Sequence, residues 1–327
     1  MKLLLKLTVT VILIGVIVWQ LGDLRAVGQL LVRIDPAYVP LILAVSTLDR
    51  ALMTYKWGRL LRGRSLHLPF FRGLQIYCAS MVWGMFLPAT VGADAIRAFS
   101  TSRTGLNGNE VVASILIERM VGFISALVLG LLSLLVLSLH GGQGTRFAPV
   151  WWLGSVVLLG ATLAFATSFS QRGFGFLHDH LLSRFADTPV MRRLRQFHRT
   201  FLAYRREKRS LAIFFGLTFG EQLMPVLFMW LIARSLGVGV GVLHIVVAVP
   251  LALLISRLPV SIDGLGVFEG AFTLLMSLAG VTAAESVAMA LAGRILQTAS
   301  WLPWWLAHVI GYGQLRPPRL LAEERRS

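Results

Sequence analysis

Apolar runs recur along the whole chain, separated by shorter segments that carry most of the Lys and Arg residues. A helix needs about 20 apolar residues to span the hydrocarbon core of a bilayer. Six stretches approach or exceed this length and predict full transmembrane helices: residues 3–22, 38–58, 111–139, 148–169, 210–235 and 284–311. We therefore predict an all-α polytopic membrane protein.

Two further apolar segments, 73–97 and 244–280, are interrupted by residues that break helices. The first contains the sequence LPATVGADAIR and the second contains LPVSIDGLGVFEG. Proline lacks an amide donor, and glycine tolerates backbone angles that other residues avoid. Broken backbone at membrane depth survives only where it is buried in protein or lines a wet cavity. We predict helix breaks at Pro88, Gly92, Pro259, Gly264 and Gly266.

The basic residues predict the orientation, because cytoplasmic loops carry an excess of Lys and Arg. With a cytoplasmic amino terminus, a segment 73–97 that enters and leaves on one side puts the basic segment 171–209 in the cytoplasm. Only three of the 31 basic residues then fall in outside loops, namely Arg25, Arg33 and Arg146. A single full crossing by 73–97 would put 171–209 outside. We therefore favour a re-entrant segment and two cytoplasmic termini, although a pair of short crossing helices gives the same loop sides.

The broken segments divide the chain into two predicted membrane repeats, residues 1–140 and residues 141–327. The second repeat includes 171–209, which predicts basic amphipathic helices on the inner membrane surface or a solvated basic loop. Corresponding elements of the two repeats cross the membrane in opposite directions. The pattern therefore predicts an inverted repeat, which is typical of secondary transporters.

The spacing of charged residues supports the repeat. Asp49 lies 39 residues before the proline of the first break, and Glu221 lies 38 residues before that of the second. The same comparison matches Arg97 with Glu269, because each closes a broken stretch. Each half would thus contain a span with an acid, a broken segment and a span with an arginine.

The composition agrees with a membrane protein, since 56% of the residues are hydrophobic and only 14% are charged. The net charge of +16 could indicate nucleic acid as a partner, but the apolar content argues against that. Basic residues here more readily set topology and meet anionic lipid headgroups. The single cysteine, Cys78, excludes an intramolecular disulfide and a cysteine metal cluster.

The sequence contains no Gly-rich phosphate loop, zinc-ligand spacing or nucleophile elbow. We therefore predict no catalytic residue, no cofactor and no metal. Tryptophans near the predicted span ends, Trp57 and Trp301 among them, are predicted to lie in interfacial belts.

Charged residues inside the apolar segments form the candidate site. A lone charge at the bilayer centre costs about 2.5–3.5 kcal/mol on insertion scales, so charges of both signs imply pairing or a hydrated cavity. Pairing that only holds the halves together is the structural alternative, above all for Glu118 and Arg119 near the cytoplasmic end of their span. The residues predicted to bind a lipid headgroup are Arg97, Arg119, Arg294, Asp49, Glu221, Glu269, Asp94 and Glu118.

The chain resembles the lysylphosphatidylglycerol synthase transmembrane-region family, also called the flippase-like domain family, from Lys6 to about Gly313. The resemblance is carried by FLPATVGADAIRAFSTSRTG with SILIERMVG, and by LPVSIDGLGVFEGAF with a following span that contains an arginine. The commoner second motif of the family is similar to P-x-S-I-G-G-L-G-x-R-E-G. Here Asp263 replaces the first of those glycines and Phe268 replaces the arginine, which bears on headgroup preference more than on the fold.

The resemblance implies movement of lipids. Family members with a fused soluble aminoacyl-transferase domain make and flip aminoacylated phosphatidylglycerol, and we expect no such domain in this sequence, which runs to Ser327. Standalone members are linked to flipping or trafficking of other polar lipids, including hopanoids and polyprenyl-linked sugars. For this chain the resemblance therefore implies the lipid-moving half without the synthase half.

We expect a non-enzymatic flippase of the bacterial inner membrane, with membrane lipids as its partners and no nucleic acid. One alternative is an integral-membrane transferase that uses Asp94 and Glu118 as an acid/base pair. Another is an accessory subunit that partners an enzyme of lipid biosynthesis. The identity of the lipid, the direction of transport, the energy source and the oligomeric state are not predicted.

Overall fold

A computed structural model describes Thr8, Gly15, Tyr204 and residues 24–85, 91–140, 148–168, 208–257, 261 and 264–312. Every regular element among these residues is an α-helix, and they contain no strand. The predicted all-helical class is therefore confirmed for this part of the chain. The breaks predicted at Pro88 and Pro259 lie outside the described residues, as does most of the predicted segment 171–209.

The longest helices coincide with predicted spans: α3 (Val39–Arg62), α6 (Gly108–His140), α7 (Ala148–Ser168) and α14 (Ala283–Tyr312). The predicted span 3–22 lies outside the described residues except for Thr8 and Gly15. A short helix that the hydropathy pattern did not predict, α2 (Leu24–Val32), precedes α3 and packs on α14.

The segment 210–235, predicted as one span, is helical but is divided into two helices. Helix α10 (Lys208–Glu221) ends just before a two-residue turn, and α11 (Met224–Ser235) follows it. Pro225 explains the division, since it occupies the first turn of α11. There its missing amide costs nothing, whereas inside a continuous helix it would remove a hydrogen bond and clash with the preceding turn.

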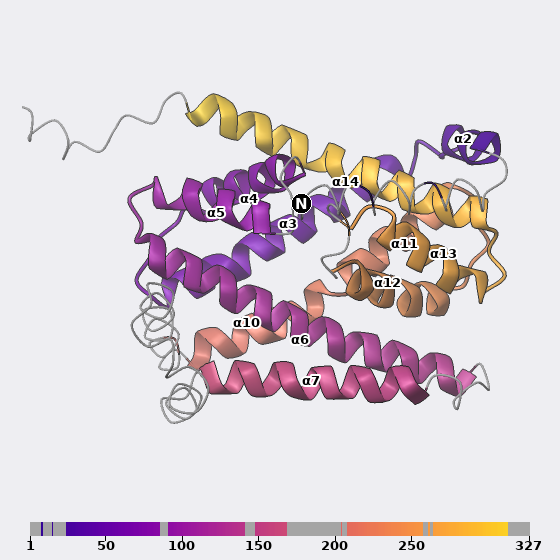
Figure 1. The fold of residues 1–327 in the computed structure, drawn as a ribbon. Helices are drawn as coiled ribbons and strands as arrows, with labels where there is room; N and C mark the ends of the chain where they lie inside the picture. Colours follow the sequence, from indigo (N-terminus) through magenta and orange to yellow (C-terminus); the bar gives the residue numbers. More distant parts are fainter. Residues whose placement is uncertain are drawn as a thin grey trace, which may run out of the picture.

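Two pairs of short helices occupy the segments in which breaks were predicted. Helices α4 (Phe70–Gly84) and α5 (Val91–Ser102) form the first pair, and α12 (Val242–Ser256) and α13 (Val267–Ser277) form the second. The two members of each pair pack side by side (Figure 1). Helices of 11 to 15 residues are only about 16–22 Å long, which is shorter than the hydrocarbon core.

The halves of the chain are interleaved by their long helices. Helix α6 packs against α12, and α14 packs against α4, so each long helix contacts the short pair of the other half. The largest apolar cluster lies among α11, α12, α13 and α14, with Ile42 and Val45 of α3 added to it. The core therefore joins elements from both halves of the sequence.

The outer surface is apolar in the way that a bilayer requires. Trp152, Leu153 and Leu159 of α7 are 74%, 66% and 62% exposed. Two segments of the described residues, Gly108–Val136 and Ser210–Ser235, are long and apolar enough to cross a membrane by length and composition. Exposed apolar surface of this extent is rare on water-soluble proteins.

The close approach of α4 and α5 depends on a glycine, which gives a test of the fold. A Cβ atom added at Gly84 would lie 2.7 Å from the Cβ and 3.0 Å from the Cα of Ala93. We expect Gly84→Ala to push the helices apart and lower the free energy of unfolding by roughly 1–3 kcal/mol, as overpacking does. The measurement is the midpoint of thermal unfolding of the purified protein in detergent.

Gly58→Ala is the matched control. Gly58 lies inside α3, and a Cβ there meets nothing within 4 Å, so the helix preference of Ala should leave stability unchanged or slightly raised. Equal unfolding midpoints for both variants would contradict the tight α4–α5 contact.

Candidate functional site

Equivalent ion pairs lie beside the two pairs of short helices. Asp94 in the first turn of α5 accepts hydrogen bonds from Nε and Nη2 of Arg119 at 2.7 and 2.8 Å. Glu269 in the first turn of α13 accepts one from Nε of Arg294 at 3.0 Å. In both pairs the arginine follows the acid by 25 residues. Each arginine is also the twelfth residue of its long helix, α6 or α14.

This geometry corrects one correspondence drawn from the sequence. Arg97 was matched with Glu269 because each closes a broken stretch, but Asp94 is the residue that occupies the equivalent place. The match by distance from the proline failed because it ignored which residue lies in the first turn of the second short helix. Acidic residues are favoured there because the helix dipole stabilises negative charge at that end.

Arg97 is buried at the centre of the first half, with 1% of its side chain exposed. Its Nη2 lies 2.9 Å from Glu118 and 3.6 Å from Asp94. The guanidinium packs against the rings of Trp57 and Tyr77, 4.9 and 4.6 Å from their centroids, and such cation–π contacts are strongest when desolvated. The Tyr77 hydroxyl donates to Glu118 at 2.9 Å, so one carboxylate receives both groups.

The sequence predicted that Trp57 lies in an interfacial belt, and the structure contradicts this. Its side chain is fully buried, and its indole N–H donates to the Ser114 hydroxyl at 2.9 Å. The prediction was wrong because position near the end of a span does not distinguish a lipid-facing ring from one that packs on a buried arginine. Trp301 is likewise buried and contacts Arg50.

A third group of charges joins the two halves. The Nζ of Lys56 on α3 lies 2.6 Å from Glu221 on α10 and 3.3 Å from the hydroxyl of Thr218. Lys56 is 1% exposed and was not among the residues predicted for the candidate site. It lies seven residues after Asp49, hence on the same face of α3. That helical spacing is the signal that could have identified it.

Asp49 is also buried and pairs with its neighbour Arg50. The guanidinium of Arg50 lies 5.9 Å from the centroid of the Tyr77 ring and 5.8 Å from that of Trp301. Tyr77 therefore has an arginine near its ring from each of two helices, Arg50 of α3 and Arg97 of α5. Trp301 in turn lines a cavity, so the charged residues of the first half extend to that cavity.

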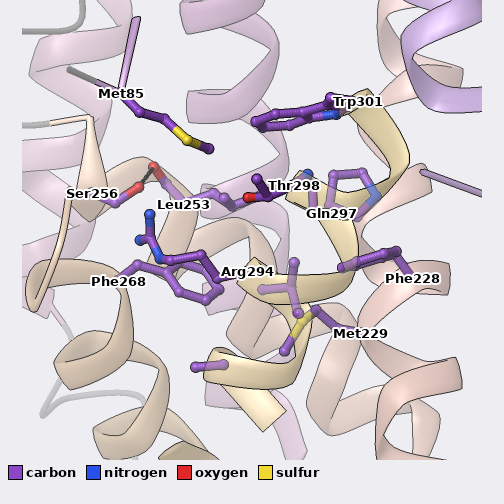
Figure 2. Close-up of a pocket in the computed structure, with 14 residues that line it drawn as sticks. Met85, Phe228, Met229, Leu253, Ser256, Phe268, Arg294, Gln297, Thr298 and Trp301 are labelled. Atoms are coloured by element: carbon purple, nitrogen blue, oxygen red, sulfur yellow. Dashed lines mark hydrogen bonds between the residues drawn. The ribbon is translucent and has the colours of Figure 1, made fainter. Parts of the chain in front are cut away.

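The cavity has a volume of about 210 Å³ and lies almost entirely within the second half, with a single residue of the first half in its lining. Met85, at the end of α4, closes one side, and residues of α11, α12, α13 and α14 form the remainder. Figure 2 shows the guanidinium of Arg294 beside Phe268, directed toward Ser256. The polar side chains that line the cavity are those of Ser256, Arg294, Gln297 and Thr298.

Glycines set the backbone between α12 and α13. Gly264 and Gly266 have φ angles of +68° and +79°, a region that residues with a side chain rarely adopt. The amide of Gly266 donates to Glu269 at 2.8 Å, which fixes the carboxylate that binds Arg294. Both glycines, at which breaks were predicted, lie between the end of α12 and the start of α13. A break was also predicted at Gly92, but this residue lies within the first turn of α5 and therefore after the interruption between α4 and α5.

The model of a protein family described as the lysylphosphatidylglycerol synthase TM region matches residues 3–304. The chain belongs to this family. None of the curated proteins compared with it matches. The predicted resemblance is thus confirmed, and the chain is a transmembrane domain of the lysylphosphatidylglycerol synthase transmembrane-region family.

Membership of this family explains why the charges are paired. An unpaired charge in the hydrocarbon region costs several kcal/mol, and every predicted site acid among the described residues has a cationic partner. Asp94 and Glu118, considered above as an acid/base pair, are both bound to arginines. The described residues contain no group of three or more His, Cys, Asp or Glu side chains that could hold a metal ion.

Glu118→Gln tests the importance of the buried pair. Without the carboxylate, Arg97 loses its nearest anion in a fully buried position, and removing one partner of a buried pair costs about 3–5 kcal/mol. We expect a large fall in the midpoint of thermal unfolding. Glu110→Gln on the same helix is the matched control, since Glu110 pairs with the partly exposed Arg64 and should cost at most about 1 kcal/mol. Equal losses would show that burial of the pair is unimportant.

Proposed function

We propose that this domain moves a polar lipid between the leaflets of a membrane, with the headgroup passing between its two halves and the acyl chains left in the bilayer. The observation that carries the proposal is the cavity, which combines the Arg294 guanidinium with hydroxyl and amide groups beside a helix break. Concave sites lined mostly by apolar side chains, with a few convergent polar groups, are the usual form of ligand sites. The headgroups considered are those of an anionic phospholipid, an aminoacylated lipid, a hopanoid or a polyprenyl-linked sugar.

The two halves would be inverted repeats. Identical spacings of acid and arginine, and the reciprocal packing of α6 on α12 and α14 on α4, support this symmetry. Helices α6 and α14 run in opposite directions in Figure 1. The ion pairs therefore approach the middle of the protein from opposite ends, as expected for a transporter built from inverted repeats.

Each pair of short helices would be re-entrant. Neither member is long enough to cross alone, and the pairs lie where breaks were predicted. Re-entrant helix ends place unpaired amides and carbonyls at membrane depth, together with the partial charges of the helix dipole. Those groups would coordinate a headgroup that the surrounding hydrocarbon cannot solvate.

The arginines and acids would have separate roles. Arg294 would bind an anionic group that enters the cavity, while Glu269 would neutralise it when the cavity is empty. Arg97 and Arg119 would serve the first half in the same way, with Asp94 and Glu118 as their counter-ions. Asp49 and Glu221 would hold the central charges in place. In this scheme the protein binds and releases lipid and catalyses no reaction.

We further propose a bacterial inner-membrane location with both termini in the cytoplasm. In Figure 1 the turn between α5 and α6 and the start of α10 lie at one end of the bundle. The turn between α13 and α14 and helix α2 lie at the opposite end. These ends correspond to the inside and outside loops predicted from the distribution of basic residues.

Labelling of introduced cysteines tests this orientation. The native Cys78 is buried and should stay unlabelled. Ser65→Cys, between α3 and α4, should react with a membrane-impermeant maleimide only in inverted membrane vesicles. Thr282→Cys, before α14, should react only in intact cells. Labelling of both positions from one side would contradict the proposed topology.

A leaflet-exchange assay tests the transport function itself. Proteoliposomes would contain a trace of fluorescent phosphatidylglycerol, and dithionite would bleach the label that reaches the outer leaflet. We expect bleaching beyond the outer-leaflet fraction only when the protein is present. Arg294→Gln should slow this exchange roughly tenfold, because a hydrogen bond to a charged group contributes about 1.5–3 kcal/mol.

Arg62→Gln at the exposed end of α3 is the control and should exchange lipid at the wild-type rate. The assay would be repeated with labelled aminoacylated, hopanoid and polyprenyl-linked lipids. Rates that are the same with and without the protein for all of these classes would refute the proposed function.

A further inference from the structure

The ion pair of Asp94 in the first half differs in one respect from that of Glu269 in the second half. Asp94 lies between two arginines, with one oxygen 2.8 Å from Nη2 of Arg119 and 3.6 Å from Nη2 of Arg97. Its other oxygen lies 2.7 Å from Nε of Arg119. In the second half, Glu269 faces Arg294 with one oxygen, while its other oxygen is held by the backbone amide of Gly266. Glu269 is therefore fixed by the backbone, whereas Asp94 is held by arginines.

The contacts of Asp94 reproduce those that a phosphate would make. A guanidinium binds a carboxylate or a phosphate through the same two parallel N–H···O bonds. A group bound by Arg119 alone would be a surface ion pair, but Arg97 behind it is fully buried. Two cations at different depths can thus contact one anion, and Asp94 is the anion that contacts both in this structure.

Arg97 has hydrogen-bonding capacity that its ion pairs do not use. It lies 2.9 Å from Glu118, yet none of its three guanidinium nitrogens makes a hydrogen bond of normal geometry with the described residues. Buried donors without partners are costly, so such groups usually have a functional role or bind a water molecule or an ion. An external anion can reach Arg119 in place of Asp94, because the Arg119 side chain is 49% exposed and the Asp94 side chain is 17% exposed.

We propose that Arg97 and Arg119 form a second anion site, for a phosphate-bearing headgroup, and that Asp94 occupies this site as an internal substitute when no headgroup is bound. The proposal depends on the proposed transport function and specifies the group that Arg97 and Arg119 would bind in the first half and the residue that it would displace. An arriving phosphate displaces the Asp94 carboxylate toward solvent and takes over its bonds to Arg119. The two arginines keep an anion throughout, so the exchange avoids the cost of leaving the buried Arg97 without one.

Anion binding to an Asp94→Asn variant tests the proposal without any transport measurement. The probes are inorganic phosphate and short-chain phosphatidylglycerol in detergent, and the readout is the rise of the unfolding midpoint across a titration, from which an affinity follows. Removal of the substitute carboxylate should tighten binding about tenfold relative to the wild type, equivalent to about 1.4 kcal/mol. A purely structural ion pair predicts a lower midpoint with no gain in affinity.

Two further variants make the result specific. Asp94→Asn combined with Arg119→Gln removes the proposed ligand as well as the substitute, so the gain in affinity should disappear. Glu110→Gln removes one negative charge from the same helix that carries Arg119, at the separate Arg64 pair, and should show no gain.

A gain with both probes supports the site and identifies the phosphate group as the part recognised. A gain with the lipid alone also supports it and adds the glycerol moiety to recognition. No gain with either probe, or an equal gain in the double variant, overturns the proposal. Because only binding is measured, failure here leaves the leaflet-exchange test of the proposed function independent.

Discussion

The need to neutralise charge away from water governs this structure. A membrane domain with charged side chains inside the hydrocarbon region must provide each of those side chains with a partner. Asp94, Glu118, Glu221 and Glu269 all meet that condition with a cation from a different helix. The ion pairs therefore also decide which helices lie together, because α5 and α6, α3 and α10, and α13 and α14 are each joined by one.

Aromatic rings extend these pairs into a connected interior. Tyr77 contacts Arg97 and Arg50, hydrogen-bonds to Glu118 and packs edge-on against Trp57. Arg50 then reaches Trp301 at the cavity. A guanidinium can be buried in this way because its planar face interacts favourably with a ring while its edge donates to a carboxylate. Lysine at the same positions would provide only a point charge.

Much of this organisation could be predicted from the sequence, and the reasons for success and failure are physical. The length of apolar runs located α3, α6, α7 and α14, and Pro and Gly located the interrupted segments. The division of α10 from α11 was not predicted, because the length of the apolar run 210–235 indicated one continuous helix despite the proline at position 225.

The pairing of charged side chains was harder to predict than the positions of the helices. Charge and spacing indicated that Asp94 and Arg119 matter, but one-dimensional spacing could not show that Asp94 contacts two arginines. Lys56 was not predicted as part of the site, because a lysine near the end of a span usually extends to the interface, whereas Glu221 and Thr218 retain it in the interior. Those contacts depend on tertiary packing that brings residues 165 positions apart together.

The reciprocal packing of the long helices has a mechanical consequence. Since α14 contacts α4 and α6 contacts α12, a shift of either short pair is transmitted to a helix that belongs to the opposite half. The Lys56–Glu221 pair meanwhile anchors α3 to α10 and resists their separation. The contacts of α14 with α4, of α6 with α12 and of α3 with α10 all cross the boundary between the two halves, so any relative movement of the halves would have to change each of them.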